Sequence, residues 1–468
     1  MDAARSRLES DLEALRELPV FVAYNANVDG IVRVDQSLET YLDRPPGVPG
    51  EAVPPDRLAS TLDLATAITR SMATGEGDEI AMTAEFAARL EAELVPDRTQ
   101  MGGQAGIMTN LLSVLGAAPI VYTYLLSETQ QSKFERPEAV RFPLVEDGRV
   151  LFVPLGSIVN TDRTKLNWIF EFDEGEELFG VRAAANTRFI AASRPPEFDL
   201  VAGDLDPVVD QVGAVIDGAL LAGYHNLTRE HVDEGYEAAH RHARDVVRRL
   251  RSGGEFPVHV EYAATHDREL RESLTELILP EADVVGLDTH ELDLLRRDLG
   301  LEPAPPAELV AVDRELREDG VEDESILEQY RTLTAVRERL GVDCLRLHAM
   351  DYHLAVTDDY LPVEAVRRGL AFAAVNAASK AATGRITGPT DLRRGLEYDP
   401  SAAGGRAIDA LADHVGASTD DGALCTPTIV ACPNRVVEEP ASTVGIGDIV
   451  SSSSFALEVA VTTERDGE

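Results

Sequence analysis

Short runs of apolar residues alternate with longer helical patterns through most of the chain. Segment 344–357 has the pattern of two strands around a short turn, and 362–383 that of a long helix. Segment 227–252 also has helical periodicity, with Thr228 as a candidate N-cap. This alternation favours a parallel α/β architecture. The segments with the pattern of buried strands are 19–27, 213–223, 256–263 and 282–288.

Two regions interrupt this alternation, at about 30–100 and 130–200, where loops and prolines mix with short strand-like runs such as 149–155 and 166–173. We expect them to combine into one β-rich subdomain inserted into the main domain. The acidic, proline-bearing stretch 299–326 is expected to be a surface insertion. The expected division is a large domain of 1–28, 101–130 and 200–468, and a smaller one of 29–100 and 131–199.

Composition limits the class of protein. The chain has 468 residues, of which 44% are hydrophobic, enough for a sizeable core. No stretch approaches the roughly 20 consecutive apolar residues that a membrane-spanning helix needs. The first residues form an acidic amphipathic pattern without the basic start and apolar block of a signal peptide. We therefore expect a cytoplasmic protein.

The charge is strongly acidic, with 43 basic and 83 acidic residues and a formal net charge of −40. The acid is spread evenly, and only Lys133, Lys165 and Lys380 are lysines. This balance is similar to that of proteins from salt-loaded cytoplasms, because salt screens the self-repulsion of such a surface. It excludes nucleic acid and anionic membranes as partners, since both would be repelled. Three cysteines make neither a disulfide framework nor a zinc site.

The segment Gly445-Ile446-Gly447-Asp448 precedes an apolar pattern that predicts a helix from Ile449 onward. The glycines allow a tight turn, and a helix N-terminus presents backbone N–H groups to an anion. An aspartate there can accept a proton from an attacking hydroxyl while the amides stabilise a phosphoryl group. The alternative is an Asp that only caps the helix, which this motif alone favours.

Two further motifs place polar groups beside the first strand. Asn25, Asn27 and Asp29 alternate directly after it, so an extended chain would put all three on one side, as suits a polyol. An Asx-rich turn is the alternative. In the second motif, Gly103 permits close backbone approach and Gln104 offers a donor and an acceptor. Small residues packing a helix near Ala105 against the sheet would explain that motif equally well.

Carboxylates follow two other predicted strands. Glu261 ends one, and Asp288 and Glu291 follow the next. Carboxylates at one sheet edge suit Mg²⁺, which prefers oxygen ligands. The alternative is that these carboxylates are ordinary solvated side chains, which are common in so acidic a chain.

Taken together, these motifs resemble the ADP-dependent sugar kinases, the archaeal-type glucokinases and phosphofructokinases of the ribokinase superfamily. The resemblance covers nearly the whole chain in order: NANVDG, GGQAG, HVE at 259–261, DTHE at 288–291 and STVGIGD at 442–448. It implies a three-layer αβα sandwich with a smaller β-rich lid. It also implies Mg²⁺, ADP as phosphoryl donor, and a sugar or sugar phosphate as acceptor.

Carried over by position, Asp448 would be the catalytic base, and Gly445, Ile446 and Gly447 would frame an anion hole. Glu261 and Glu291 would organise Mg²⁺ through water, with Asp288 beside them. The residues around the sugar would be Asn25, Asn27, Asp29, Gly103 and Gln104. Those bordering the nucleotide would be His348, Arg435, Val436 and Val437.

The chain departs from the family pattern at Asp288, where the family has asparagine, and in NTRFI at 186–190, which has one extra residue. Lys165 and Arg188, in the expected lid, favour fructose 6-phosphate as acceptor because a phosphate needs a cation. Pairing of such cations with nearby acids such as Glu171 is the alternative.

Three rival functions remain. A lid carboxylate, Glu76 or Glu79, would suit a glucokinase, and one enzyme could use both sugars. An ATP-dependent ribokinase-type kinase and a non-catalytic sugar or nucleotide sensor are the other two.

Overall fold

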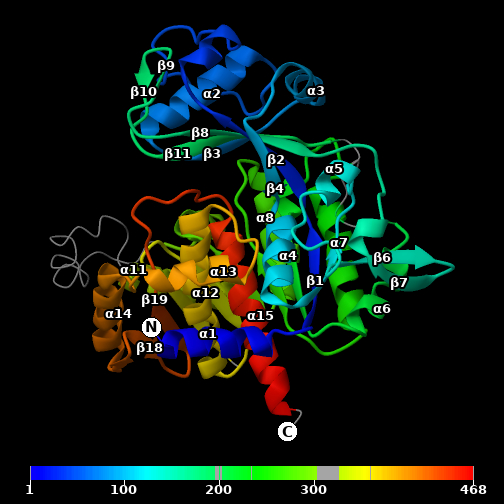
Figure 1. Cartoon of the computed structure of the whole chain (residues 1–468), viewed down its shortest axis with the longest axis vertical. Coiled ribbons are helices and arrows are strands. Elements are labelled where there is room, and N and C mark those ends of the chain that lie inside the picture. Colours follow the sequence, from blue (N-terminus) through cyan, green and yellow to red (C-terminus); the bar gives the residue numbers. More distant parts are fainter. Residues whose placement is uncertain are drawn as a thin grey trace.

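Two sheets organise the chain in the computed structural model, which describes residues 2–195, 200, 203–232, 234–302, 326–358 and 360–466. Most of the expected insertion at 299–326 lies outside the described residues. The larger sheet runs through the body of the molecule, and the smaller one lies above it (Figure 1). No helix among the described residues is long and apolar enough to cross a membrane.

Within the described residues the larger sheet has twelve strands, of which the seven from β15 to β6 run parallel. In spatial order they are β17 (Thr419–Asp420), β18 (Ala423–Cys425), β19 (Ile429–Pro433), β16 (Tyr352–Thr357), β15 (Cys344–His348), β14 (Val284–Leu287), β13 (Val258–Glu261), β12 (Gly218–Ala222), β1 (Pro19–Tyr24), β5 (Ala118–Tyr122), β6 (Arg141–Glu146) and β7 (Arg149–Pro154). Every residue of β12, β13 and β14 is buried, as expected of parallel strands covered on both faces.

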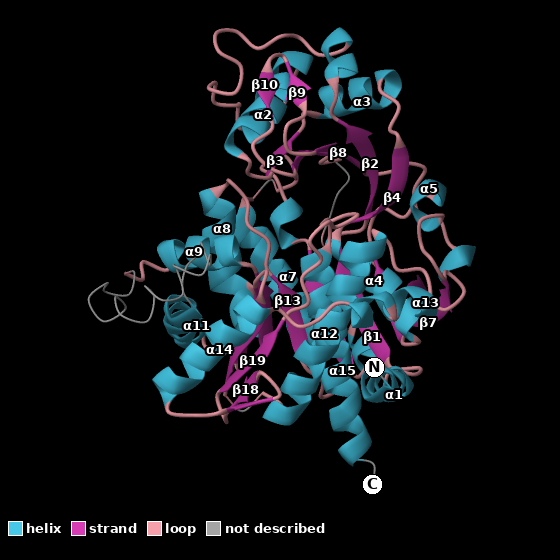
Figure 2. Cartoon of the chain, turned by 60° about the vertical axis from the view of Figure 1, so that its left-hand side comes forward, coloured by secondary structure: helices cyan, strands magenta, loops and turns pink. Residues whose placement is uncertain are grey.

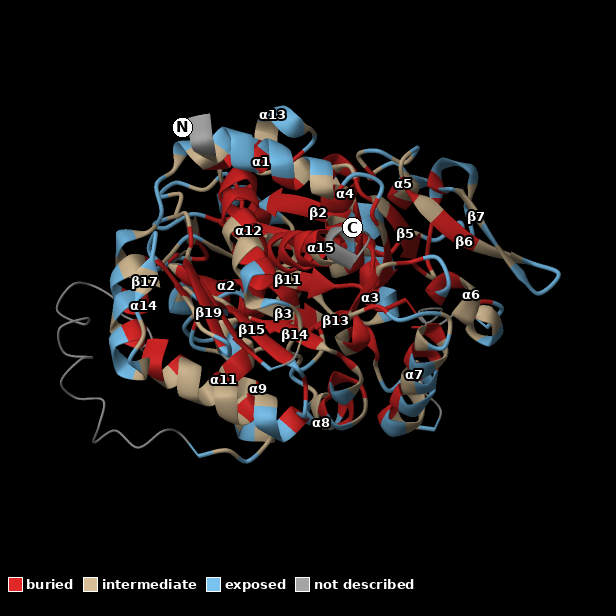
Figure 3. Ribbon diagram, turned by 90° about the horizontal axis from the view of Figure 1, so that it is seen from below, coloured by how far each residue is buried: buried red, intermediate tan, exposed pale blue. Residues whose placement is uncertain are grey.

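Helices cover both faces of this sheet, so the body is a three-layer αβα sandwich (Figure 3). One apolar cluster joins the sheet to α7 (Tyr236–Arg251), α8 (Arg268–Leu277), α9 (Thr289–Asp298), α11 (Ile326–Leu340) and α14 (Ala402–Val415). A second joins it to α1 (Asp2–Ala14), α4 (Gln104–Leu115), α12 (Val363–Thr383) and α15 (Ile446–Asp466). The expected fold class is confirmed.

The smaller sheet, in the part of the chain that the structure describes, has five strands: β3 (Asp78–Ala81), β11 (Thr187–Ala192), β8 (Leu166–Phe172), β2 (Asn27–Arg33) and β4 (Arg98–Gly102). Helices α2 (Thr61–Thr74) and α3 (Ala84–Glu93) cover the face turned away from the body, over a core of their own (Figure 2). A short ribbon of β9 (Glu177–Leu178) and β10 (Val181–Arg182) completes this part. Strand β2 follows β1 after two residues, so the chain passes directly from one sheet to the other.

Two sequence expectations differ from the structure. Residues 131–199 were expected in the smaller part, but β6 and β7 form a hairpin at the edge of the large sheet. Alternating apolar residues predict a strand there without saying which sheet it joins. The helix expected over 227–252 begins only at Tyr236, because Gly235 has a φ of 88° and breaks the helix before it. Thr228 lies instead in a turn before the helix, where its N–H donates to the Nδ1 of His231 at 3.0 Å.

Candidate active site

Asp448 is the third residue of helix α15, which begins at Ile446. Gly445, just before the helix, has a φ of 73°, and a Cβ there would stand 2.7 Å from the Cδ1 of Ile107. Only glycine fits that turn without strain. The first N–H groups of a helix have no intrahelical acceptor and carry the positive end of its dipole. The turn therefore presents an anion-binding helix end with a carboxyl beside it.

The surroundings of Asp448 determine its protonation. Burial raises the pKa of the Asp448 carboxyl well above its ordinary value, and the charges of Glu261 and Asp29 raise it further. Lys380 and Arg188 act in the opposite direction and lower the pKa. A buried carboxyl whose charge is balanced by distant cations is suited to accept a proton from a bound hydroxyl.

Asn25, Asn27 and Asp29 are all buried where β1 passes into β2. The Nδ2 of Asn27 donates to the Oδ1 of Asp29 at 2.8 Å, and burial raises the pKa of Asp29 to about 7. Gly102 and Gly103 pack against them so closely that a Cβ on Gly102 would stand 2.0 Å from the Asp29 Oδ1. The structure thus brings together the two motifs predicted beside the first strand.

Three buried polar atoms here have no hydrogen-bond partner among the described residues. They are the Oδ1 of Asn27, the Oε1 of Gln104 and the Nε of Arg188. Unsatisfied buried polar groups cost free energy, and most have a partner in a folded protein. Two acceptors and one cationic donor left in this way match the hydroxyl and phosphate groups of a ligand.

Lys165 lies directly before β8 and is 1% exposed. Its ammonium donates to the Oδ1 of Asn25 at 2.7 Å and to the Oδ1 of Asn226 at 2.8 Å. The alternative was that Lys165 or Arg188 pairs with a nearby acid such as Glu171. The cation that pairs with Glu171 in the structure is Arg98, whose Nη2 lies 3.0 Å from a Glu171 carboxylate oxygen. Arg188, on β11, donates to the Oγ1 of Thr443 at 3.2 Å, just before the turn of residues 445–448.

Glu261 ends β13 and is buried against three neighbours. The Nε2 of His259 lies 2.9 Å from its Oε2, and the Nε2 of His348 lies 3.5 Å from its Oε1. Burial raises the pKa of Glu261 to about 7, whereas a hydrogen bond from Ser451 lowers it. A Cβ on Gly286 would stand 2.2 Å from the Glu261 Oε2, so this carboxylate needs a glycine beside it.

Asp288 and Glu291 form a capping box at the start of α9. The Asp288 Oδ1 accepts from the N–H of Glu291 at 2.8 Å, and the Glu291 Oε2 accepts from the N–H of Asp288 at 2.9 Å. Burial raises the pKa of Glu291 well above its ordinary value, and Asp288 and Glu261 add to the shift. Among the described residues, no three acidic, imidazole or thiol groups form a direct ligand set for a metal ion.

The residues expected near the nucleotide lie in two different places. His348, at the end of β15, approaches Gly447, where a Cβ would stand 2.9 Å from its Nε2. Arg435 follows β19, and its guanidinium donates to the backbone oxygen of Tyr398. Val436 and Val437 continue the same loop, half-buried. His348 is thus beside the turn of residues 445–448, and the Arg435 loop follows β19, which is separated from β15 by β16 in the sheet.

Sequence reasoning missed several residues of this site. Gly286 and Ser451 support Glu261, Asn226 accepts from Lys165, and Lys380 bears on Asp448. Only Lys380 carried a signal, as one of three lysines in the chain. The others become recognisable only when distant elements are brought together.

Comparison with known proteins decides the family. The model of the ADP-specific phosphofructokinase/glucokinase conserved region matches residues 18–457. The chain belongs to this family. The family membership that the sequence motifs implied is confirmed, and the protein is an ADP-dependent sugar kinase.

Relatives match over almost their whole length. The chain is 30% identical to the ADP-specific phosphofructokinase of Thermococcus zilligii, over 97% of this chain and 98% of that one. It is 28% identical to an ADP-dependent glucose/glucosamine kinase of Pyrococcus furiosus, over 96% and 97%. A solved ADP-dependent kinase in complex with fructose-6-phosphate and ADPβS is 27% identical, with a TM-score of 0.82 and 98% of each chain covered.

Proposed function

We propose that the protein transfers the β-phosphoryl group of ADP to a hydroxyl of fructose 6-phosphate, giving fructose 1,6-bisphosphate and AMP. The new bond joins the sugar oxygen to the β-phosphorus, and the bond between the α- and β-phosphates breaks. Asp448 accepts the proton of the attacking hydroxyl. The names of the phosphofructokinase relatives and of the solved complex support this choice of acceptor.

The observation that carries the proposal is the combination of Asp448 with the unpartnered buried groups nearby. Asn27 and Gln104 offer acceptors for sugar hydroxyls, and Arg188 offers a cationic donor. Lys165 adds a second cation, which is buried and donates to the amide oxygens of Asn25 and Asn226. Two cations in an otherwise acidic protein favour a phosphorylated acceptor.

Gly445, Ile446 and Gly447 frame the helix N-terminus at which the transferring phosphoryl group would be stabilised. Positioning and charge stabilisation account for most of catalysis in phosphoryl transfer. We infer that the smaller sheet and its helices act as a lid that excludes water from this site.

Mg²⁺ would be held through water by Glu261, Glu291 and Asp288. Burial and mutual repulsion raise the pKa of Glu261 and of Glu291, so a cation between them would relieve an unfavourable charge. Their hydrogen bonds within the protein favour water-mediated contacts over direct ligation. When bound, the metal would neutralise charge on the phosphates.

Glucose is the second candidate acceptor, and Glu79 is the observation in its favour. Glu79 is half-buried and lies 2.6 Å from the Arg194 guanidinium. Arg194, His225 and Lys165 all lower the pKa of its carboxyl against the effect of burial. An ionised carboxylate there suits hydroxyl groups. Glu76, the other carboxylate considered, is exposed.

Steady-state assays with each donor and acceptor test the proposal. We expect kcat/KM to be largest for ADP with fructose 6-phosphate, with AMP formed in equal amount to the bisphosphate. Turnover with ATP but not ADP would contradict the proposed donor. A higher kcat/KM for glucose would assign the enzyme to the second candidate.

A further inference from the structure

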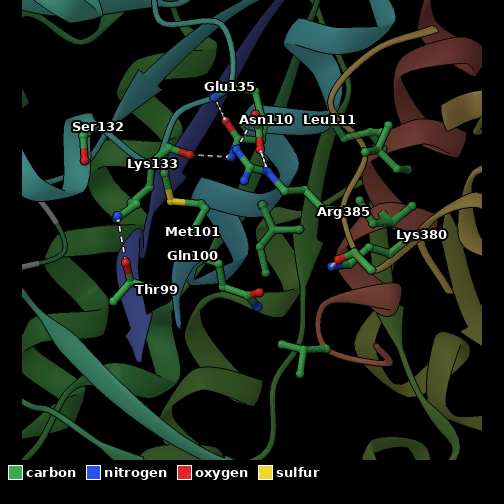
Figure 4. A pocket seen from close by; sticks show the side chains of 15 residues that line it. Thr99, Gln100, Met101, Asn110, Leu111, Ser132, Lys133, Glu135, Lys380 and Arg385 are labelled. Carbon is green, nitrogen blue, oxygen red and sulfur yellow. Dashed lines mark hydrogen bonds and ion pairs between the residues drawn. The ribbon is translucent and has the colours of Figure 1, made fainter. Parts of the chain in front are cut away.

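A pocket of about 220 Å³ lies beside the catalytic turn and is lined by both parts of the molecule (Figure 4). Strand β4 of the small sheet provides one wall. Helix α4, residues 132–135, and the end of α12 with 384–386 provide the others. Val444 and Ile449, on either side of the catalytic segment, also line it. None of the described residues proposed above to contact sugar, nucleotide or metal is among the lining residues.

The charge of this pocket is opposite to that of the whole chain. Two of the three lysines, Lys133 and Lys380, line it together with Arg385, and Glu135 is the only acidic residue among the described lining groups. Figure 4 shows the two lysines on opposite sides of the pocket. The sum of these formal charges is about +2, in a protein with a net charge of −40.

The pocket's cations retain binding capacity. Arg385 is paired with Glu135, but neither lysine forms an ion pair with any described residue. The Lys380 ammonium donates to the backbone oxygen of Gly384, and that of Lys133 donates to the Oγ1 of Thr99 at 2.8 Å. An ammonium has three donors, so each retains two for another acceptor.

Lys380 is the better placed of the two lysines for a strong interaction. It is 8% exposed, and burial lowers its pKa to about 8. A buried cation without a carboxylate partner is unfavourable, and an anion bound beside it would restore its charge.

We propose that this pocket is a second binding site, for a small anion that carries a phosphate group. The volume is below the roughly 300–1,000 Å³ of sites for drug-sized ligands, which favours inorganic phosphate or a short phosphate ester over a nucleotide. Met101, Leu111 and Ile386 give part of the lining an apolar character that suits a short carbon chain.

A ligand in this site would contact both parts of the molecule, the one built on the small sheet and the one built on the large sheet. It would touch Thr99 and Gln100 on β4 and Lys380 on α12, across the junction at which the smaller part meets the body. If the arrangement of the two parts changes when sugar binds, the two ligands influence each other's affinity reciprocally.

Pyridoxal 5′-phosphate tests the proposal, because it pairs a phosphate with a lysine-reactive aldehyde. The protein is treated with it, reduced with borohydride, and mapped by peptide mass spectrometry, with pyridoxal as the probe without phosphate. We expect at least about tenfold more label on Lys133 or Lys380 with the phosphate-bearing probe, because its phosphate accepts charge-assisted hydrogen bonds from these ammonium groups. Equal labelling of both by the two probes would overturn the proposal, as would enhancement confined to Lys165.

Thermal unfolding with variants gives an independent test. Inorganic phosphate and glycerol 3-phosphate are titrated separately, so that their two shifts distinguish free phosphate from a phosphate ester. We expect either ligand to raise Tm less in the double variant Lys133→Gln/Arg385→Gln than in wild type. Arg182→Gln, which removes an exposed charge on β10, should respond as wild type does. Identical shifts in all three proteins would contradict the site.

Discussion

The Lys165 ammonium donates to the Oδ1 of Asn25 at 2.7 Å and thereby joins the start of β8 in the small sheet to the end of β1 in the large one. The Oδ1 of Asn226, after β12, accepts from the same ammonium at 2.8 Å. Burial lowers the pKa of Lys165 well below its ordinary value, although the charges of Glu79 and Asp29 raise it. An anionic substrate beside this ammonium would favour its charged form.

Lys165→Ala is therefore expected to weaken the use of fructose 6-phosphate far more than that of glucose. A hydrogen bond to a charged group contributes about 1.5–3 kcal/mol, so kcat/KM for the sugar phosphate should fall about ten- to a hundredfold more. Arg163→Ala, which removes an exposed cation two residues earlier, is the control and should leave the ratio unchanged. Equal losses for both sugars would refute the role of Lys165 in phosphate binding.

Glu79→Gln is expected to have the opposite selectivity. The substitution keeps the size of the side chain but removes the charge paired with Arg194. We expect kcat/KM for glucose to fall more than that for fructose 6-phosphate. Steady-state kinetics with both sugars check this. A larger loss of kcat/KM with the sugar phosphate would show that Glu79 does not favour glucose as the acceptor.

Gly286→Ala is expected to impair catalysis through Glu261. The new Cβ would stand 2.2 Å from the Glu261 Oε2, so that carboxylate must move. We expect a higher Mg²⁺ concentration for half-maximal activity and a lower kcat. Gly405→Ala, where nothing lies within 4 Å of the new Cβ, is the matched control. An unchanged dependence of activity on Mg²⁺ concentration in Gly286→Ala would show that Glu261 does not help to hold the metal.

Asp448→Asn is expected to stabilise the fold above acidic pH. Burial raises the pKa of Asp448 in the folded protein, so the ionised carboxylate destabilises the fold once the pH exceeds the unfolded pKa. The amide removes that cost, as substitutions at strained functional sites often do. The increase in Tm should be largest at neutral and alkaline pH and vanish below about pH 4, where both states are protonated. A constant difference across this range would contradict the raised pKa.

The body of the fold was predictable from the sequence because its parallel strands are covered on both faces. The strands β12, β13 and β14 are buried along their whole length, and the pair β15 and β16 follows the pattern expected around a short turn. The hairpin of β6 and β7 was assigned to the wrong sheet. Its alternation fixes which residues face inward but carries no information on the partner strand.

The candidate site was predictable where residues adjacent in sequence act together. Gly445 to Asp448 and Asn25 to Asp29 each lie on a single turn or strand end. The supporting residues Gly286 and Asn226 could not be found in this way, because their importance comes from contacts across the fold. The capping box of Asp288 and Glu291 has a visible sequence pattern, whereas the resemblance implies only a role near the metal for these residues.

The central claim is that Asp448 accepts the proton of the sugar hydroxyl during transfer from ADP. The most direct measurement is ³¹P NMR of wild type and Asp448→Asn with ADP, Mg²⁺ and fructose 6-phosphate, alongside calorimetric titration of the sugar. We expect wild type to produce equal amounts of AMP and fructose 1,6-bisphosphate. The variant should bind fructose 6-phosphate but form neither product. Turnover retained in Asp448→Asn would contradict the assignment of Asp448 as the base.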